Sequence, residues 1–346
     1  MCIRDRFSIL GVLGGIAAGG IIARFGARRM LLCGLLATAL GTAAGALAPG
    51  YGVLLATRVV EGLGFLLITV AGPAALQRIV LPSSRDLAFA LWSCYMPTGM
   101  AVAMLASQAF GDWHAYWWCA GAAVLVALAC VAALAPATPG GKGLSWAGLR
   151  QDTTDTLGAA GPMLLAASFT LYSLMFFALF TFLPVLLMDK LGLPLATAGL
   201  YSAAASAANI IGNLGAGVLL SRGWRRSTLI ACASAAMGVV ALLIFRSVFP
   251  AMPTFLLCVL FSAVGGLIPA TLLGTAPLVA PRPALTASAV GLVMMGSNLG
   301  QVIGPVTVGG VIDRYGWAQA SLIVAAAALG GVFIAWRLRR LGGAGL

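Results

Sequence analysis

The sequence predicts an all-α polytopic membrane protein, and three observations support this fold class. Hydrophobic residues make up 61% of the 346 residues and charged residues only 8%, whereas about a quarter of the residues in soluble domains are charged. Eleven apolar runs are long enough to cross a bilayer. The basic residues gather in the connections on one side of these runs. Lipid is the solvent that suits so apolar a surface.

The predicted spans are continuous apolar segments, not alternating ones, which excludes a transmembrane β-barrel. In chain order they are residues 7–23, 30–49, 52–77, 87–110, 115–135, 161–187, 197–220, 228–247, 252–279, 285–311 and 317–336. Four spans contain an internal proline that is expected to bend the helix, namely Pro73, Pro97, Pro269 and Pro305.

The connections between spans alternate between the two sides of the membrane, and their charges differ. One side carries 14 Lys and Arg residues and the other carries 5. By the positive-inside rule the first side is cytoplasmic, so we expect a multi-pass protein of the cell's inner (cytoplasmic) membrane. The net charge of +12 then belongs to loops that face anionic lipid, and no nucleic-acid partner is expected.

The two halves of the chain resemble each other. The loop at Arg24 recurs 198 positions later at Arg222, and Trp113 recurs 204 positions later as Trp317. A repeat of this length, with the same orientation in each copy, predicts two six-helix-type bundles in a parallel pseudo-repeat. The predicted parts are a non-native leader at 1–6, an N-terminal bundle at 7–135, a Pro- and Gly-rich cytoplasmic linker at 136–160, and a C-terminal six-helix bundle at 161–346.

The loop after the first span contains a short motif. It fits the pattern G-x-x-x-D-R-x-G-R-R, and the matching residues are Gly19, Arg24, Gly26 and Arg28. Two positions depart from the pattern, since Ala23 replaces the Asp and Ala27 replaces an Arg. The corresponding loop of the second half contains Arg222, Arg225 and Arg226. We interpret these loop arginines as determinants of topology and as cytoplasmic latches, not as substrate ligands.

The third span fits a second pattern, R-x-x-x-G-x-G, at Arg58, Gly62 and Gly64. With both motifs in this order and spacing, the sequence from Phe7 onward resembles the major facilitator superfamily. The resemblance implies twelve helices, a monomeric secondary transporter that works by alternating access, and no cofactor or metal. The first predicted span would correspond to the family's second helix, so we expect an N-terminally truncated chain; a genuine eleven-helix protein is the alternative.

Charged side chains inside a bilayer are rare, because each costs about 2.5–3.5 kcal/mol at a helix centre on insertion scales. Arg58 and Glu61 lie three residues apart in the third span and can pair on one helix face. We interpret Arg58 as a group that attracts an anionic substrate and Glu61 as a group that takes up and releases a proton. The alternative is a pair that only fixes helix packing near the outer end of the span.

Polar side chains at helical spacing are the candidates for lining a central cavity. They are Tyr95, Thr98, Thr170, Ser173, Ser206, Asn209, Asn213, Asn298 and Gln301. In lipid each of these groups needs a partner, so the alternative is that they hold helices together. With a single histidine and only one acidic side chain inside a span, the sequence lacks a catalytic set, and we expect no enzyme.

The sequence therefore predicts a secondary transporter of a small solute, coupled to protons, with a small organic anion as the favoured substrate. Residues 91–99 faintly resemble the cyanate and nitroimidazole permease branch of the family. Two alternatives stay open, which are an antiporter that exports drug-like compounds and a non-transporting truncated fragment or receptor.

Overall fold

A computed structural model describes residues 3–137, 140–141 and 146–341. Within these residues eleven helical spans are long and apolar enough to cross a membrane, which confirms the predicted number. The spans agree with the predicted runs to within a few residues at most ends. The fourth span shows the largest shift at its start, since it begins at Pro82 instead of residue 87 and ends at Ala106.

The first part of the chain forms α1 (Ile3–Phe25), α2 (Ala27–Ala46), α3 (Tyr51–Ile79), the 3₁₀ turn η1 (Pro82–Ser84), α4 (Arg85–Ser93), α5 (Tyr95–Ala109), α6 (Trp113–Leu134) and α7 (Trp146–Gly158). The remainder forms α8 (Ala160–Phe180), α9 (Leu183–Leu191), α10 (Leu195–Ser221), α11 (Arg226–Phe245), α12 (Ala251–Gly265), α13 (Leu267–Thr275), η2 (Pro283–Leu285), α14 (Thr286–Tyr315) and α15 (Trp317–Leu341).

Packing divides the chain into two compact units. The first comprises Met1–Val80, Phe110–Ala166 and Ala276–Leu299, and the second comprises Leu81–Ala109, Ala167–Thr275 and Gly300–Leu346. These units are defined by contacts, whereas the predicted bundles are defined by the sequence repeat. The division of the chain into two bundles joined by a linker therefore stays a prediction.

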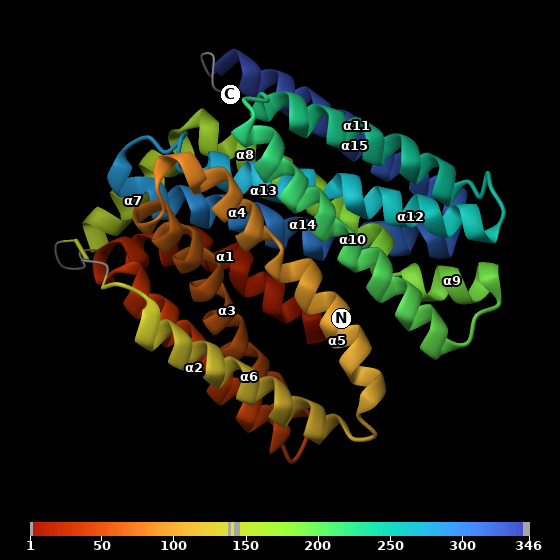
Figure 1. Ribbon diagram of the computed structural model, residues 1–346, viewed down its shortest axis with the longest axis horizontal. Helices are drawn as coiled ribbons and strands as arrows, with labels where there is room; N and C mark the ends of the chain where they lie inside the picture. The colour runs from red at the N-terminus through yellow and green to blue at the C-terminus, as the bar shows by residue number, and fades with distance from the viewer. Residues whose placement is uncertain (1–2, 138–139, 142–145, 342–346) are drawn as a thin grey trace. The chain divides into compact units, whose positions relative to one another are not determined.

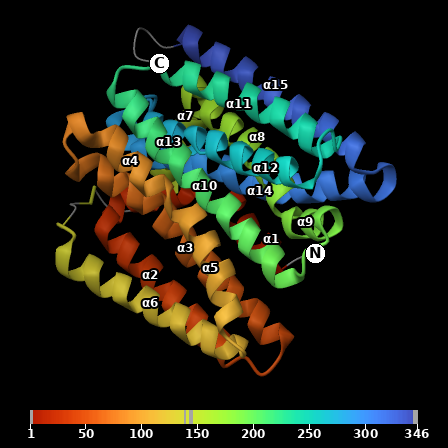
Figure 2. The same cartoon turned by 45° about the vertical axis from the view of Figure 1, so that its right-hand side comes forward.

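Small residues let helices approach closely inside the first unit. A Cβ atom on Gly15 of α1 would stand 2.5 Å from the carbonyl oxygen of Gly291 in α14, and one on Gly34 of α2 would stand 2.7 Å from the carbonyl oxygen of Gly64 in α3. Such small-residue contacts are a main source of helix association in lipid. Helix α2 packs against both α3 and α6 in this unit, and α2 and α6 run side by side in Figures 1 and 2.

The second unit is organised around α10, which packs against α4, α5, α12 and α13. Gly212 of α10 faces the backbone of α12 near Ala263, where a side chain would have no room. Helices α11 and α15 lie side by side along one edge of this unit (Figures 1 and 2). Phe245 and Phe261 are among its fully buried side chains.

In the described part of the chain three spans are interrupted, and in each the first helix ends four residues before a proline. Helix α4 ends at Ser93 before Pro97, α8 ends at Phe180 before Pro184, and α12 ends at Gly265 before Pro269. Proline has no N–H to donate, and its ring clashes with the carbonyl group four residues earlier. The bend predicted from Pro97 and Pro269 is thus explained, whereas Pro73 and Pro305 lie inside uninterrupted helices.

The loops that carry the repeated arginines use glycine in the same conformation. Gly26 between α1 and α2 has φ of 91°, and Gly223 between α10 and α11 has φ of 85°. Residues with a side chain rarely adopt this left-handed region, so glycine suits both turns. The two copies of the loop therefore share a backbone feature as well as basic residues.

Helix α7 lies inside residues 136–160, which the composition predicts to be a cytoplasmic linker between the two halves. It covers Trp146–Gly158 and packs against α1. Leu149 of α7 fills the space beside Gly20, where a Cβ atom would meet the leucine side chain. The residues at 138–139 and 142–145 of the predicted linker, including Lys142, lie outside the described residues.

Candidate functional site

Arg58 and Glu61 of α3 form the ion pair that their spacing predicts. The Arg58 Nη2 donates to Glu61 Oε1, and Arg58 Nη1 lies against Glu61 Oε2, each at 2.5 Å. Such a two-point contact between guanidinium and carboxylate fixes the direction of both side chains as well as their positions.

Helices α2 and α6 enclose this pair. Gly41 and Gly45 of α2 leave the space that it fills. A Cβ atom on Gly41 would stand 2.6 Å from Glu61 Cγ, and one on Gly45 would stand 2.7 Å from Arg58 Nη2. The guanidinium carbon of Arg58 lies 4.3 Å from the ring centroid of Trp117 in α6, in a cation–π contact. The pair thus joins three helices, as a packing role requires, and its transport role stays a prediction.

Burial makes the two charges depend on each other. Only 8% of the Glu61 side chain and 15% of the Arg58 side chain are exposed. Glu61 is the only buried carboxylate in the described part of the chain, and Arg58 Nε is buried there without a hydrogen-bond partner. Because a lone charge in such surroundings is costly, a process that separates the pair must supply a new counter-charge or a proton.

A second polar centre lies around Asn209 of α10, in the second unit. The Asn209 Nδ2 donates to the Tyr172 hydroxyl at 3.2 Å and to the backbone carbonyl of Ser262 at 2.9 Å. Asn213, one turn further along α10, donates from Nδ2 to Asn209 Oδ1 at 2.8 Å. This network ties α8, α10 and α12 together through side chains that are almost completely buried.

The polar residues Ser206, Asn209 and Asn213 form a stripe along α10, and two of its side-chain oxygens have no protein partner. They are Ser206 Oγ and Asn213 Oδ1, and both side chains are 0% exposed within the described residues. Buried polar atoms are nearly always hydrogen-bonded, to water or a ligand where the protein offers nothing. The stripe can therefore accept hydrogen bonds from a solute or from ordered water.

The other predicted cavity residues lie in different surroundings. Ser173, Asn298 and Gln301 are buried, Tyr95 and Thr170 are half-buried, and Thr98 is exposed. Asn298 of α14 donates its amide to the Met294 carbonyl at 2.8 Å and packs against Gly11 of α1. The spacing along each helix thus identified polar positions, and their role in lining a cavity stays a prediction.

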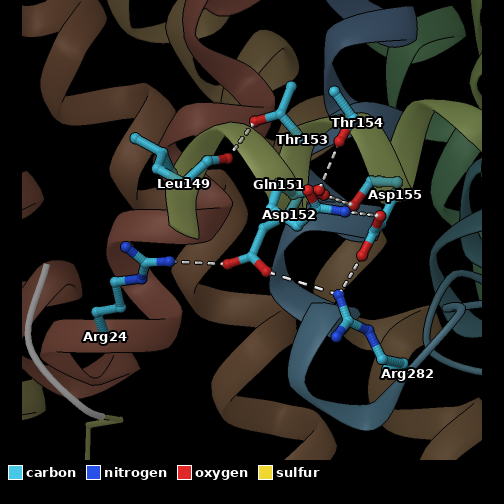
Figure 3. Close-up of polar contacts among 9 residues, drawn as sticks. Arg24, Leu149, Gln151, Asp152, Thr153, Thr154, Asp155 and Arg282 are labelled. Atoms are coloured by element: carbon cyan, nitrogen blue, oxygen red, sulfur yellow. Dashed lines mark hydrogen bonds and ion pairs between the residues drawn. The ribbon is translucent and has the colours of Figure 1, made fainter. Parts of the chain in front are cut away.

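The loop arginine Arg24 belongs to a charge cluster with α7 in the first unit (Figure 3). Its Nη2 donates to Asp152 at 2.9 Å. The other carboxylate oxygen of Asp152 lies 3.8 Å from Nη2 of Arg282, and Arg282 also pairs with Asp155. Helix α7 therefore forms ion pairs with Arg24 near the end of α1 and with Arg282 just before η2.

The equivalent loop in the second unit uses a different partner. Arg226, at the start of α11, donates to Asp86 of α4 at 2.7 Å, and the two side chains are only 12% and 22% exposed. In the first unit Arg28 donates to the Ala132 carbonyl of α6 at 2.6 Å. Arg222 and Arg225 are exposed.

Comparison with known families decides the identity of the fold. A model of the Major Facilitator Superfamily matches residues 6–288, which is most of the chain. The chain belongs to this family. No curated protein matches it in sequence.

Two solved major facilitator structures resemble this one. The human organic anion transporter MFSD10 (TETRAN) superposes with a TM-score of 0.84 at 16% sequence identity, over 96% of this chain and 82% of that chain. The Escherichia coli fucose:proton symporter FucP superposes with a TM-score of 0.77 at 15% identity, over 97% of this chain and 90% of that chain. At these identities the likeness concerns the fold.

As a major facilitator superfamily member, the chain is a multi-pass membrane protein built for secondary transport of a small molecule, and not an enzyme. Sequence reasoning singled out Arg58 and Asn209 but missed their partners Trp117 and Tyr172. It also missed Asp152, the partner of Arg24, because this residue lies in the segment that was interpreted as a linker. Only Trp117 gave a signal, as one of several aromatic residues at a helix start.

Proposed function

We propose that this chain is a proton-coupled secondary transporter of small organic anions, with Arg58 and Glu61 as the groups that bind anion and proton. The observation that carries the proposal is the buried pair on α3, since it combines one fixed cation with the only buried carboxylate of the described chain. Because Arg58 and Glu61 neutralise each other, an anion that binds Arg58 must be accompanied by a proton that binds Glu61.

The link follows from the cost of buried charge. In the resting state Arg58 is neutralised by Glu61. When a carboxylate or phosphate of the substrate binds Arg58, the site would hold two negative charges and one positive charge. Protonation of Glu61 removes the excess, since an uncompensated charge at membrane depth costs about 2.5–3.5 kcal/mol. Anion and proton therefore bind together, and they leave together when the pair re-forms.

In this proposal the polar side chains of the other helices line the cavity of their own unit and offer hydrogen bonds there. Asn209 and Tyr172 offer an amide and a hydroxyl on neighbouring helices, and Ser206 Oγ and Asn213 Oδ1 are acceptors without protein partners in the described chain. We assign the same role to the remaining candidates, Tyr95, Thr98, Thr170, Ser173, Asn298 and Gln301. Hydrogen bonds of this kind select a solute by its polar groups.

We further propose that the arginine-bearing loops face the cytoplasm, so that the protein lies in the inner membrane and these loops touch anionic lipid. The charge asymmetry of the connections supports this orientation. In the same proposal the chain acts as a monomer, and its two sequence halves are the bodies that alternate. The name of one solved relative, an organic anion transporter, fits the proposed substrate class, and that of the other, a fucose:proton symporter, fits the proposed coupling to protons but not the anion.

Uptake into proteoliposomes tests the proposal. Vesicles containing the purified protein receive a panel of radiolabelled small carboxylates and sugars, with and without an inward proton gradient. We expect carboxylate uptake that the gradient accelerates, abolition by Arg58→Ala, and uptake without proton dependence in Glu61→Gln. The exposed Arg314→Ala is the matched control and should transport normally. Uptake of neutral solutes only, or full proton dependence in Glu61→Gln, would contradict the proposal, and proton-driven loss of preloaded drug-like compounds would favour the export alternative.

A further inference from the structure

Helices α11 and α15 pack side by side in the second unit (Figures 1 and 2). A Cβ atom on Gly238 of α11 would stand 2.5 Å from Cβ of Ala328 in α15. One on Gly331 of α15 would stand 2.7 Å from Oγ of Ser234 in α11. A step back along α11 thus corresponds to a step forward along α15, so the two helices are antiparallel. The start of α11 therefore lies beside the end of α15.

Exposed arginines gather at this shared end. Some come from the turn between α10 and α11 and the others from the last turns of α15, and we call them the arginine cluster. They are Arg222, Arg225, Arg337, Arg339 and Arg340. Within the described residues no carboxylate pairs with any of them, and Asp86 of α4 pairs with the neighbouring Arg226 instead. The cluster therefore carries positive charge that another molecule can neutralise.

An exposed apolar stripe on α15 leads to this cluster. Its residues recur at alternate spacings of four and three, which places them on one face of the helix, and each of them is exposed. They are Leu322, Ala326, Leu329, Phe333 and Trp336, and the next position of the stripe is Arg340. In a membrane protein an exposed apolar face of this kind contacts lipid tails.

The stripe meets the cluster at an aromatic side chain. The guanidinium carbon of Arg340 lies 3.8 Å from the ring centroid of Trp336, in a cation–π contact. A second exposed tryptophan, Trp224, directly precedes Arg225 at the start of α11. Tryptophan is enriched at the depth of lipid headgroups. The arginines are thus held where lipid phosphates lie, and a guanidinium binds phosphate through two parallel hydrogen bonds.

We propose that the arginine cluster and the α15 stripe form a binding site for an anionic phospholipid. The phosphate pairs with Arg225 and Arg340, and an acyl chain lies along Phe333 and Leu329. The combination of charge and apolar stripe on one helix face selects a lipid over a soluble anion, which has nothing to place on the stripe. The inference rests on the proposed contact of the arginine-bearing loops with anionic lipid, and it assigns that contact to one site.

Native mass spectrometry of the purified protein in neutral detergent tests the site. The protein is titrated with phosphatidylglycerol and with phosphatidylcholine of the same acyl chains, and the bound adducts are counted. We expect phosphatidylglycerol to bind more tightly than phosphatidylcholine in the parent protein. The double variant Arg225→Gln with Arg340→Gln should weaken phosphatidylglycerol binding at least about tenfold.

The same two helices offer a matched control at their opposite ends. Arg246 follows α11 and Arg314 precedes α15, and both are exposed. The double variant Arg246→Gln with Arg314→Gln removes the same charge and should bind phosphatidylglycerol like the parent protein. Equal losses in the two double variants would overturn the proposal, and so would equal affinities of the parent for the two lipids. A dimer that forms as phosphatidylglycerol is lost would also overturn it, since a second copy would then cover the stripe.

Two further arms separate this site from the proposed function. Arg58→Ala should retain phosphatidylglycerol binding, so a failure of the transport proposal leaves the lipid site intact. Detergent micelles have no sides, so binding in them does not depend on the orientation of the protein in a cell. A wrong orientation would appear as labelling of Arg222→Cys, above that of the parent, by an impermeant thiol reagent applied to intact cells. Loss of phosphatidylglycerol binding in Arg58→Ala would contradict a separate lipid site.

Discussion

Asp152 of α7 accepts a hydrogen bond of 2.9 Å from Arg24, the residue next to the end of α1. The family motif has a carboxylate at position 23, directly before this arginine, and the present chain has alanine there. Helix α7 therefore supplies an acidic partner to the motif from 128 residues away in sequence. Arg24 is therefore neutralised by Asp152 of α7, although the loop itself has Ala23 where the family pattern has an aspartate.

Asp152→Asn tests whether this contact stabilises the protein. The Arg24 side chain is only 13% exposed, and the variant leaves it without its carboxylate partner. Loss of a partly exposed charge-assisted hydrogen bond should lower the free energy of unfolding by about 1–2 kcal/mol. The measurement is the thermal midpoint in detergent. The exposed Asp313→Asn on α14 is the control and should leave the midpoint unchanged; equal midpoints for both variants would refute the contact's role.

The Asp86–Arg226 contact of the second unit is suited to a double-mutant cycle. Removing either partner alone leaves the other charge largely buried, whereas removing both leaves none. We expect Asp86→Asn and Arg226→Gln each to destabilise the protein, with the double variant less affected than the sum by about 1–3 kcal/mol. The thermal midpoints of the four proteins give the coupling. Strict additivity would mean that the two side chains do not interact.

Gly41→Ala tests the fit of α2 against the buried pair. The new methyl group would stand 2.6 Å from Glu61 Cγ, so the carboxylate or the helix must move. Overpacking of this kind costs about 1–3 kcal/mol, and we expect slower transport together with a lower thermal midpoint. Gly52→Ala on α3 is the control, because no atom lies within 4 Å of its added carbon. Parent-like transport in Gly41→Ala would show that the pair tolerates displacement.

The Asn209 network predicts unequal effects for its members. Asn209→Ala removes the donor to Tyr172 and to the Ser262 carbonyl, which keeps the Gly266 N–H, and it removes the side-chain oxygen that accepts from Asn213. The loss of these buried contacts should cost about 1–3 kcal/mol. Tyr172→Phe loses only the long 3.2 Å contact and should cost less than half as much. Midpoints of thermal unfolding compare the two. A larger effect for Tyr172→Phe would mean that the tyrosine hydroxyl has a different principal partner.

The spans were predictable because lipid demands long apolar helices with few charges, and this demand leaves a clear trace in composition. Helix ends were less predictable, as the start of the fourth span at Pro82 illustrates. Interruptions follow a local rule, since Pro97 and Pro269 act on the carbonyl four residues earlier. Proline does not always interrupt a helix, since α3 continues through Pro73 and α14 continues through Pro305.

Helix α7 was not predictable because its stability comes from contacts. Many of its residues are polar, and composition alone assigned the segment to a linker. In the structure Leu149 packs on Gly20 and Asp152 pairs with Arg24, and these contacts hold the helix in place. The ion pair of Arg58 with Glu61 followed from helical spacing. The contact of Arg58 with Trp117 did not, because it joins residues that are far apart in sequence.

The central claim is that anion and proton bind together at Arg58 and Glu61, and proton uptake on binding tests it most directly. A transported anion is titrated into the purified protein by calorimetry in several buffers of different ionisation enthalpy at one pH, and the slope gives the protons taken up per anion. We predict close to one proton for the parent protein and none for Glu61→Gln. An uptake near zero in the parent protein, or an unchanged uptake in Glu61→Gln, would contradict the account.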